Sequence, residues 1–555
     1  MLTSLLKLQR KASGRSLPNW LLHALPLAAC SFFFVAGLAF LPLLGVEDDE
    51  ALFGVVFYEP HGGGYQYHLG RLHIPLMILP YLGTLKSWLY RPISATFGTT
   101  IEAIRIPALL AGAASLWVFY WFLIKIAGYR AAAIGVGLLA VDSMYLLTTC
   151  FDWGPVALQH LLLWSGLLLL VSFWHRRDQW RLAAGFFLFG LLLWDKALAF
   201  WTLGGVGVAA LVTIRRQMSG ILTARRLTVV AAAFAFGALP LILYNIHTRG
   251  GTLRGNAVYD GNDVRGKTKA LLRTFGGSGL YGWMQAADPS EERTAPPEVA
   301  GVEASAALAG ALGHPAQGWL FYAFCAALLL APLAQGAARS AILFAAIALA
   351  VAWAQMLFTA AAGGSVHHII LLWPLPQMVI GVSFAAASRR LGRWGTPVLA
   401  TLVVLIMGSN LAVLNENYLR MARNGGAISW SDAVFPLSDY LQGKKAHYIF
   451  CLDWGYLNAL RLLSNNALPV RVGSTEIGKP ELSDEDRRLI TAMISEPGGL
   501  FVTHTANFEF MPGISAKLVR FAEGAGYRRE MLATVRDSYG RPTYEVYRFA
   551  PNRHL

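Results

Sequence analysis

The chain is a succession of apolar segments, each long enough for a membrane helix, and this pattern constrains its fold more than any other feature. About 20 apolar residues in a helix span the hydrocarbon core of a bilayer. Mean hydropathy is +0.47, and only 14% of the 555 residues are charged. The sequence therefore predicts a polytopic α-helical membrane protein with about eleven transmembrane helices. These begin near Trp20, Ile104, Ala131, Val156, Leu182, Ala199, Val229, Gly318, Ala341, Ile369 and Pro397.

The distribution of basic residues predicts how the chain crosses the membrane. The net charge of +14 would suit a nucleic-acid partner, but the basic residues gather in alternate loops, as they do in cytoplasmic loops of membrane proteins. We therefore expect no nucleic-acid partner. The pattern predicts a multi-pass protein of the bacterial plasma membrane with a cytoplasmic amino terminus and a periplasmic or extracellular carboxy-terminal domain. The basic loops contain Lys7 to Arg15, Lys125 and Arg130, Arg176 to Arg181, Arg215 to Arg226, Arg339, and Arg389 to Arg393.

Three regions break the apolar pattern and define the expected domains. Residues 1–415 form the predicted transmembrane module, with external loops at 45–102 and 247–317. In the first loop Pro75 and Pro80 interrupt the apolar stretch from Leu72 to Tyr90, which predicts short helices along the membrane surface.

Residues 416–555 alternate between strand and helix patterns and predict a soluble extracytoplasmic α/β domain. Its expected strands begin near Ala446, Pro469, Leu500 and Thr543. Ser483 and Asp486 have the spacing of a capping box. A domain of this length can hold a core of its own.

Four consecutive carboxylates, Glu47 to Glu50, follow the first apolar segment on the predicted external side. Adjacent negative charges repel one another, so such a run favours either a raised pKa or a bound cation. The predicted topology brings further polar groups to the same face. These are Lys86, Arg105, Asp152, His367 and His368, and together they can form an acid/base and anion-binding centre.

Each of these residues also has a plain structural interpretation. Lys86 could extend its ammonium to lipid head groups, and Asp152 could cap the helix that starts at Pro155. The two histidines could be interface residues without a ligand. Asp195 and Lys196, at the outer end of the fifth span, are expected to form an ion pair, with a place in the lining of the cavity as the alternative.

The first 200 residues or so resemble the GT-C glycosyltransferases, in the branch of protein O-mannosyltransferases and aminoarabinose (lipid A) transferases, and specifically the bacterial family-39-type members. The resemblance rests on Asp49 and Glu50 after the first helix, followed by Phe53 and Gly54. Further stretches that look alike are GRLHIPLMILPYLGTLKSWLY, IRIPALLAG, FDWGP and LLWDKALAFW.

The resemblance implies a function and roles for the residues. It implies inverting transfer of a sugar from a polyprenyl-phosphate donor to an extracytoplasmic hydroxyl of a protein, lipid or glycan. Asp49 would be the catalytic base with Glu50 as its partner, and Glu47 and Asp48 would belong to the solvated loop. Lys86, Arg105, Asp152, His367 and His368 would bind the donor phosphate or substrate. The expected partners are the polyprenyl-phosphate sugar, membrane lipids and an unidentified acceptor.

The chain departs from the family in places, and other functions stay open. The His-Pro-Pro segment of the eukaryotic mannosyltransferases is here only the loose YHLGRLHIP. A divalent cation shared by Asp49 and Asp152 is possible, although the two are not a diagnostic ligand set. A transporter or flippase is one alternative, and a surface-polysaccharide ligase or polymerase with a diphosphate-linked donor is another.

Overall fold

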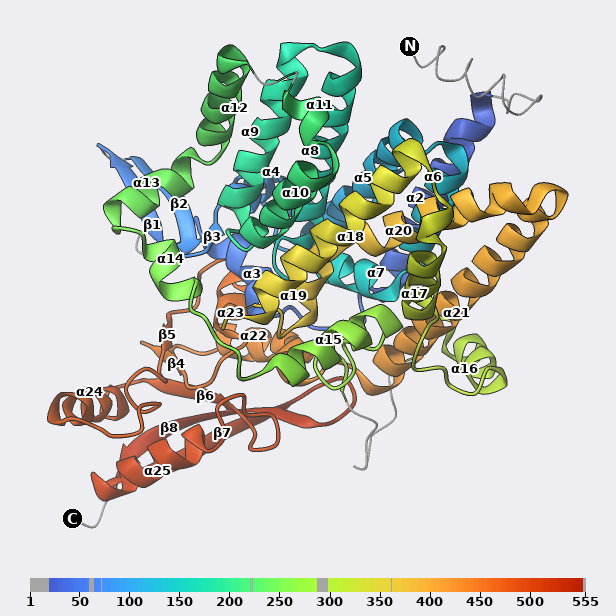
Figure 1. Ribbon diagram of the computed structural model, residues 1–555. Coiled ribbons are helices and arrows are strands. Elements are labelled where there is room, and N and C mark those ends of the chain that lie inside the picture. Colours follow the sequence, from blue (N-terminus) through green and yellow to red (C-terminus); the bar gives the residue numbers. More distant parts are fainter. Residues whose placement is uncertain are drawn as a thin grey trace.

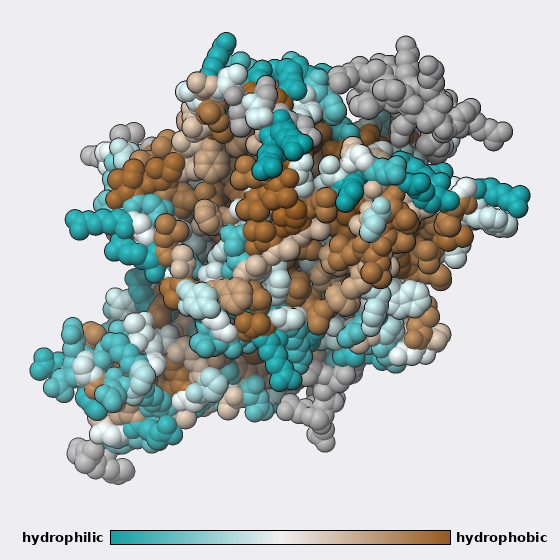
Figure 2. Space-filling model, in the orientation of Figure 1, coloured by the Kyte–Doolittle hydropathy of each residue, from teal (hydrophilic) through white to brown (hydrophobic). Residues whose placement is uncertain are grey.

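The computed structural model describes residues 19–58, 64–70, 72–219, 221, 223–286, 298–360 and 362–552. Lys7 to Arg15, used above for the topology, lie outside these residues. A bundle of helices forms one part of the molecule, and a sheet domain built from the carboxy-terminal residues covers one end of the bundle (Figure 1). Apolar residues dominate the surface of the bundle, and hydrophilic residues gather at its far end and over the sheet domain (Figure 2).

Each predicted transmembrane segment overlaps a helix, but the count of eleven spans is not confirmed. Five stretches of the described residues are long and apolar enough to cross a membrane, or seven if two bent pairs of helices are counted. The bent pairs are α6 with α7 (58°) and α12 with α13 (72°). The bundle helices are α2 (Asn19–Phe40), α5 (Ile101–Ile126), α6 (Tyr129–Ala140), α7 (Ser143–Cys150), α8 (Val156–Arg176), α9 (Gln179–Asp195), α10 (Ala199–Thr213), α11 (Arg215–Ser219), α12 (Ala224–Gly237), α13 (Leu239–His247), α17 (Leu320–Leu330), α18 (Gly336–Leu357), α19 (Val366–Ile369), α20 (Leu375–Ser388) and α21 (Gly395–Asn424).

A buried carboxylate holds the break between α6 and α7. Asp142 caps α7 by accepting from the backbone N–H of Tyr145, and its Oδ2 accepts from Trp373 Nε1 at 2.7 Å and from Gln377 Nε2 at 3.0 Å. Each of these bonds satisfies a polar group that would otherwise be costly to bury. Asp142 thereby ties the broken helix pair to α20 and its preceding turn.

The predicted surface helices of the first external loop are only partly present. The helices α3 (Asp48–Val55) and α4 (Leu85–Phe97) form. The apolar stretch from Leu72 instead begins with β2 (Leu72–Leu79) and β3 (Leu82–Gly83), which join β1 (Tyr65–Leu69) in a three-stranded antiparallel sheet. The helical prediction for this stretch is wrong because β2 pairs with β1 and β3, and Pro75 is accommodated in the strand beside the point where the register shifts. Its carbonyl accepts hydrogen bonds from Thr84 Oγ1 and Trp88 Nε1.

The second external loop contains three helices, α14 (Gly251–Asn256), α15 (Val264–Gly276) and α16 (Val302–Ala311). Buried Lys267 of α15 donates to the backbone oxygens of Met356, Leu357 and Thr359 at the end of α18. A cation placed on the last carbonyls of a helix complements its dipole. This contact fixes the loop to the bundle.

The carboxy-terminal domain confirms the predicted α/β pattern. All four predicted strands are present, and the capping box of Ser483 with Asp486 opens α24. The sheet has the order β5-β4-β6-β8-β7, with β4 parallel to both neighbours and β7 and β8 forming an antiparallel hairpin. Its elements are α22 (Val434–Gln442), β4 (Ile449–Cys451), α23 (Leu457–Leu463), β5 (Val470–Val472), α24 (Asp484–Ile494), β6 (Leu500–His504), α25 (Ile514–Gly524), β7 (Tyr527–Arg536) and β8 (Pro542–Pro551).

The domain shares an apolar core with the first external loop. Val46, Ala51 and Val55 around α3 are buried together with residues of α22, α23 and the strands. The helix α21 runs through the predicted boundary at residue 415 and ends at Asn424. The acidic run therefore lies at the junction of the bundle and the sheet domain.

Candidate functional site

The four carboxylates of the acidic run have four different surroundings. They begin the helix α3, where the exposed N–H groups of the first turn favour negative charge. Three of them are buried and only Asp49 is partly exposed. The expectation that Glu47 and Asp48 belong to a solvated loop is therefore wrong, because neighbouring elements cover both side chains.

Glu47 and Asp48 hold α3 in place. Glu47 Oε2 accepts the backbone N–H of Asp49 at 2.7 Å and caps the helix. Asp48 accepts two hydrogen bonds from Asn458, which comes from the carboxy-terminal domain: from its backbone N–H at 2.7 Å and from its Nδ2 at 2.8 Å. Burial raises the pKa of Asp48 to about 6, although the bonds from Asn458 oppose the shift. The sheet domain thus binds α3 one residue before Asp49.

Glu50 makes a buried, bidentate ion pair with Arg105 of α5. Its two oxygens lie 2.7 Å from Nε and 2.8 Å from Nη2 of the arginine. The guanidinium also donates to the carbonyls of Leu41, Leu44 and Gly45, in the turn between α2 and α3. Arg105 is fully buried, so its hydrogen bonds connect α5, the turn and the acidic helix.

Lys86 and Asp152 form a second buried ion pair next to the acidic helix. Asp152 Oδ2 also accepts from Tyr90 Oη at 3.1 Å, and Lys86 Nζ lies 3.9 Å from the centre of the Phe53 ring. Burial raises the pKa of Asp152 to about 6, with Lys86 opposing the shift. Asp152 adopts a left-handed backbone with φ 46°, in the turn FDWGP between α7 and α8.

Asp49 faces a cationic and aromatic environment. Burial raises the pKa of its carboxyl, and Lys196, the Trp153 side chain and Lys86 counteract the shift. Burial lowers the pKa of Lys196 to about 8. The negative charges of Asp49 and, to a smaller extent, Asp195 oppose this decrease. Asp49 is therefore the carboxylate of the run that two lysines influence through their charge and that keeps some access to solvent.

Lys196 is the residue whose importance the sequence reasoning missed. The predicted ion pair with Asp195 is not its main interaction, because Asp195 Oδ2 accepts from Gln159 Nε2 at 2.7 Å and Asp49 exerts the stronger charge effect on Lys196. Gly154 makes room for the ammonium, because a Cβ there would lie 3.0 Å from Lys196 Nζ. A lysine at the end of an apolar segment is a signal that could have identified it.

The two histidines lie beyond Trp153. The ring of His367 is 4.3 Å from the Trp153 ring and 4.2 Å from the His368 ring, centre to centre. His367 Nδ1 is 2.6 Å from Ser365 Oγ. Lys196 is close enough to act on the charge of both imidazoles. The predicted residues are thus brought together from α3, α4, the FDWGP turn and α19, while Arg105 is enclosed behind them.

Lysine side chains supply positive charge near the two aspartates. Of the two aspartates predicted to share a divalent cation, Asp152 forms an ion pair with Lys86, and Asp49 is influenced by the charge of Lys196 and Lys86. Among the residues that the structure describes, no group of three or more His, Cys, Asp or Glu side chains is arranged to hold a metal ion.

Comparisons with known proteins find the fold but no sequence relative. No protein-family profile and no curated protein matches the sequence. ArnT from Cupriavidus metallidurans bound to undecaprenyl phosphate is similar with a TM-score of 0.55 and 13% identity, over 95% of this chain and 98% of that one. The apo state of the same protein gives a TM-score of 0.55 and 13% identity, over 95% and 97% of the two chains. The arabinofuranosyltransferase AftD from Mycobacteria gives 0.48 and 15%, over 97% of this chain and 40% of that one.

The likeness to ArnT extends over nearly the whole of both chains, so it includes the bundle and the carboxy-terminal domain in one arrangement. At this identity it concerns the fold. The predicted fold, a bundle of apolar helices followed by an α/β domain, is therefore confirmed, while the GT-C superfamily and its branch stay predictions.

Proposed function

We propose that the protein is a membrane glycosyltransferase that takes its sugar from a polyprenyl-phosphate-linked donor. The observation that carries the proposal is the position of Asp49, a partly exposed carboxylate at the junction of bundle and sheet domain, with Lys196 and Lys86 near enough to act on its charge. A base beside cations suits a reaction in which a hydroxyl loses a proton while a phosphate departs. The fold agrees, since the similar ArnT structure contains undecaprenyl phosphate.

In the proposed reaction an acceptor hydroxyl hydrogen-bonds to the Asp49 carboxylate on the extracytoplasmic side. Its oxygen attacks the anomeric carbon as the proton moves to Asp49, and the bond from that carbon to the phosphate oxygen breaks. The lipid phosphate leaves with the bonding electrons, and the configuration at the anomeric carbon inverts. The raised pKa of Asp49 makes it a stronger base than an exposed aspartate.

Lys196, Lys86, His367 and His368 are the proposed partners of the departing phosphate. Lys196 contributes most, because Asp49 is the carboxylate that most favours the charged form of its ammonium. Lys86 acts from its ion pair with Asp152, which fixes the ammonium beside the site. Glu50 and Arg105 support the reaction by holding α3, since their buried pair occupies both side chains.

The test is consumption of labelled donors by the purified protein. A panel of polyprenyl-monophosphate sugars, with one diphosphate-linked glycan, is incubated with candidate acceptors. The wild type should consume one monophosphate donor, and Asp49→Asn should reduce the rate by at least about a hundredfold, the lower end for loss of a general base. Asp439→Asn, at an exposed position of α22, is the matched control and should retain the wild-type rate.

Three results would contradict the proposal. Equal rates for Asp49→Asn and the wild type would show that Asp49 is not the catalytic base. Consumption of the diphosphate-linked glycan alone would favour a polysaccharide ligase or polymerase. Movement of a solute across sealed vesicles without donor consumption would favour a transporter.

A further inference from the structure

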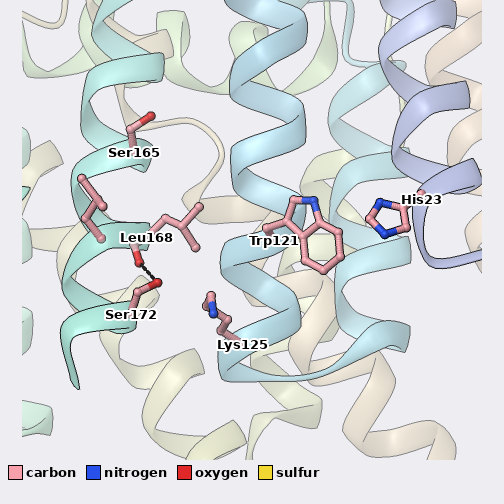
Figure 3. A pocket seen from close by; sticks show the side chains of 7 residues that line it. His23, Trp121, Lys125, Ser165, Leu168 and Ser172 are labelled. Atoms are coloured by element: carbon pink, nitrogen blue, oxygen red, sulfur yellow. Dashed lines mark hydrogen bonds between the residues drawn. The ribbon is translucent and has the colours of Figure 1, made fainter. Parts of the chain in front are cut away.

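A second site lies at the far end of the bundle. A groove with a volume of about 600 Å³ opens between α2, α5 and α8. Trp121, Leu168 and Leu169 give it apolar walls, and Lys125 provides its charged group. Figure 3 shows Trp121 and Lys125 between His23 of α2 and the side chains of α8.

The groove is distinct from the site around Asp49. Arg105 and Lys125 lie on the same helix α5, so about 30 Å separates them along its axis. The other two helices agree, because His23 is near the start of α2 and Ser172 is in the last turns of α8, whereas α2 ends and α8 begins close to the acidic helix. The distance is the thickness of a bilayer core, so the groove opens at the opposite membrane surface.

The charges around the groove are mostly positive. Arg176 and Arg181 lie close enough to repel the Lys125 ammonium. Asp178 is the nearby carboxylate, and it is paired with Arg181. Within the described residues Lys125 has no carboxylate partner inside 4.0 Å, and residues 1–18, which precede α2, contain no Asp or Glu.

An unpaired ammonium above an apolar groove matches a ligand with an anionic head and an apolar tail. A free phosphate would leave the apolar walls unused. A donor lipid bound here would hold its phosphate a membrane thickness away from Asp49. We propose that the groove binds an anionic membrane phospholipid, with its head-group phosphate at Lys125 and one acyl chain along Trp121 and Leu168.

The experiment compares lipid binding by native mass spectrometry of the detergent-purified protein. Phosphatidylglycerol and phosphatidylcholine with the same acyl chains are titrated in turn. The wild type should retain the anionic lipid preferentially. Lys125→Gln should weaken that binding by about fivefold, the effect of one cation near an anionic lipid, and Lys125→Arg should restore it.

Two further variants separate the groove from general charge attraction. Arg130 starts α6 at the same end and donates to the hydroxyls of Ser388 and Thr396, so Arg130→Gln removes a cation outside the groove and should leave binding unchanged. Leu169→Trp fills the groove without changing a charge and should weaken the binding of both lipids. Thermal unfolding of each variant checks that it is folded.

The proposal is overturned if Lys125→Gln and Arg130→Gln bind phosphatidylglycerol alike, or if Leu169→Trp has no effect. Displacement of phosphatidylglycerol by an equal amount of polyprenyl phosphate would also overturn it, since the groove would then prefer the donor lipid. None of these results depends on sugar transfer, so the outcome is independent of the proposed enzymatic function.

Discussion

The contact between Asp48 and Asn458 predicts how strongly the sheet domain holds the acidic helix. Asn458→Ala removes the bond from Nδ2 to Asp48 Oδ2, 2.8 Å long, but keeps the backbone bond of 2.7 Å. A hydrogen bond to a charged group contributes about 1.5–3 kcal/mol. Losing one of the two should therefore make local opening of α3 about 30-fold more frequent, which corresponds to about 2 kcal/mol.

Hydrogen exchange measured by mass spectrometry on the peptide covering Asp48–Val55 reports this opening. Asn466→Ala is the matched control, because its Nδ2 donates to the neutral carbonyl of Tyr58 at 3.2 Å in the same interface. The increase in exchange caused by Asn466→Ala should be smaller, and it should appear around Tyr58 and not at the start of α3. The effect of Asn458→Ala should also shrink below about pH 6, where Asp48 becomes protonated and the bond loses its charge.

Two outcomes would refute this reasoning. If α3 exchanges at the same rate in Asn458→Ala and in the wild type, the sheet domain does not hold the helix through this contact. If the effect of Asn458→Ala is the same on both sides of pH 6, the charge of Asp48 is not what strengthens the bond.

Two further predictions concern the groups around Asp49. Initial rates of donor consumption should rise with pH through the raised pKa of Asp49, because the base must be ionised, and should fall above about pH 8, where Lys196 loses its proton. Lys196→Arg should remove the alkaline fall, and an unchanged profile would exclude Lys196 from the reaction. Arg105→Met leaves Glu50 buried without its cation and should lower the free energy of unfolding by about 3–5 kcal/mol, measured by denaturant unfolding. The double variant Arg105→Met with Glu50→Leu should recover part of the loss, and equal stability of the single variant and wild type would contradict the buried pair.

The sequence predicted the parts of the fold that depend on short-range patterns. Apolar runs identified the helices, and alternating residues identified four of the five strands in the carboxy-terminal sheet. The missed strand β7, Tyr527–Arg536, is an edge strand whose residues Arg528, Arg529 and Glu530 obscure the alternation. The prolines after Leu72 interrupt the apolar run but do not distinguish short helices from strands, and only the pairing of β2 with β1 and β3 selects the strand.

The site was predicted as a set of residue types but not as a set of contacts. Topology could bring Asp49, Lys86, Asp152 and His367 to one face. It could not distinguish a lysine in an ion pair from one that faces the base, as Lys196 does. Asn458 is neutral and lies 410 positions from Asp48, so no local signal identified it.

The shared core between α3 and the sheet domain changes what counts as a separable part of this protein. Residues 416–555 looked like a module that could be excised or exchanged. However, a cut at residue 415 divides the continuous helix α21, and the excised piece would expose the apolar surface that Val46, Ala51 and Val55 cover. Grafting a foreign carboxy-terminal domain onto the bundle would require matching residues in the first external loop. The acidic helix and the sheet domain are therefore one packing unit, although more than 350 residues separate them in the sequence.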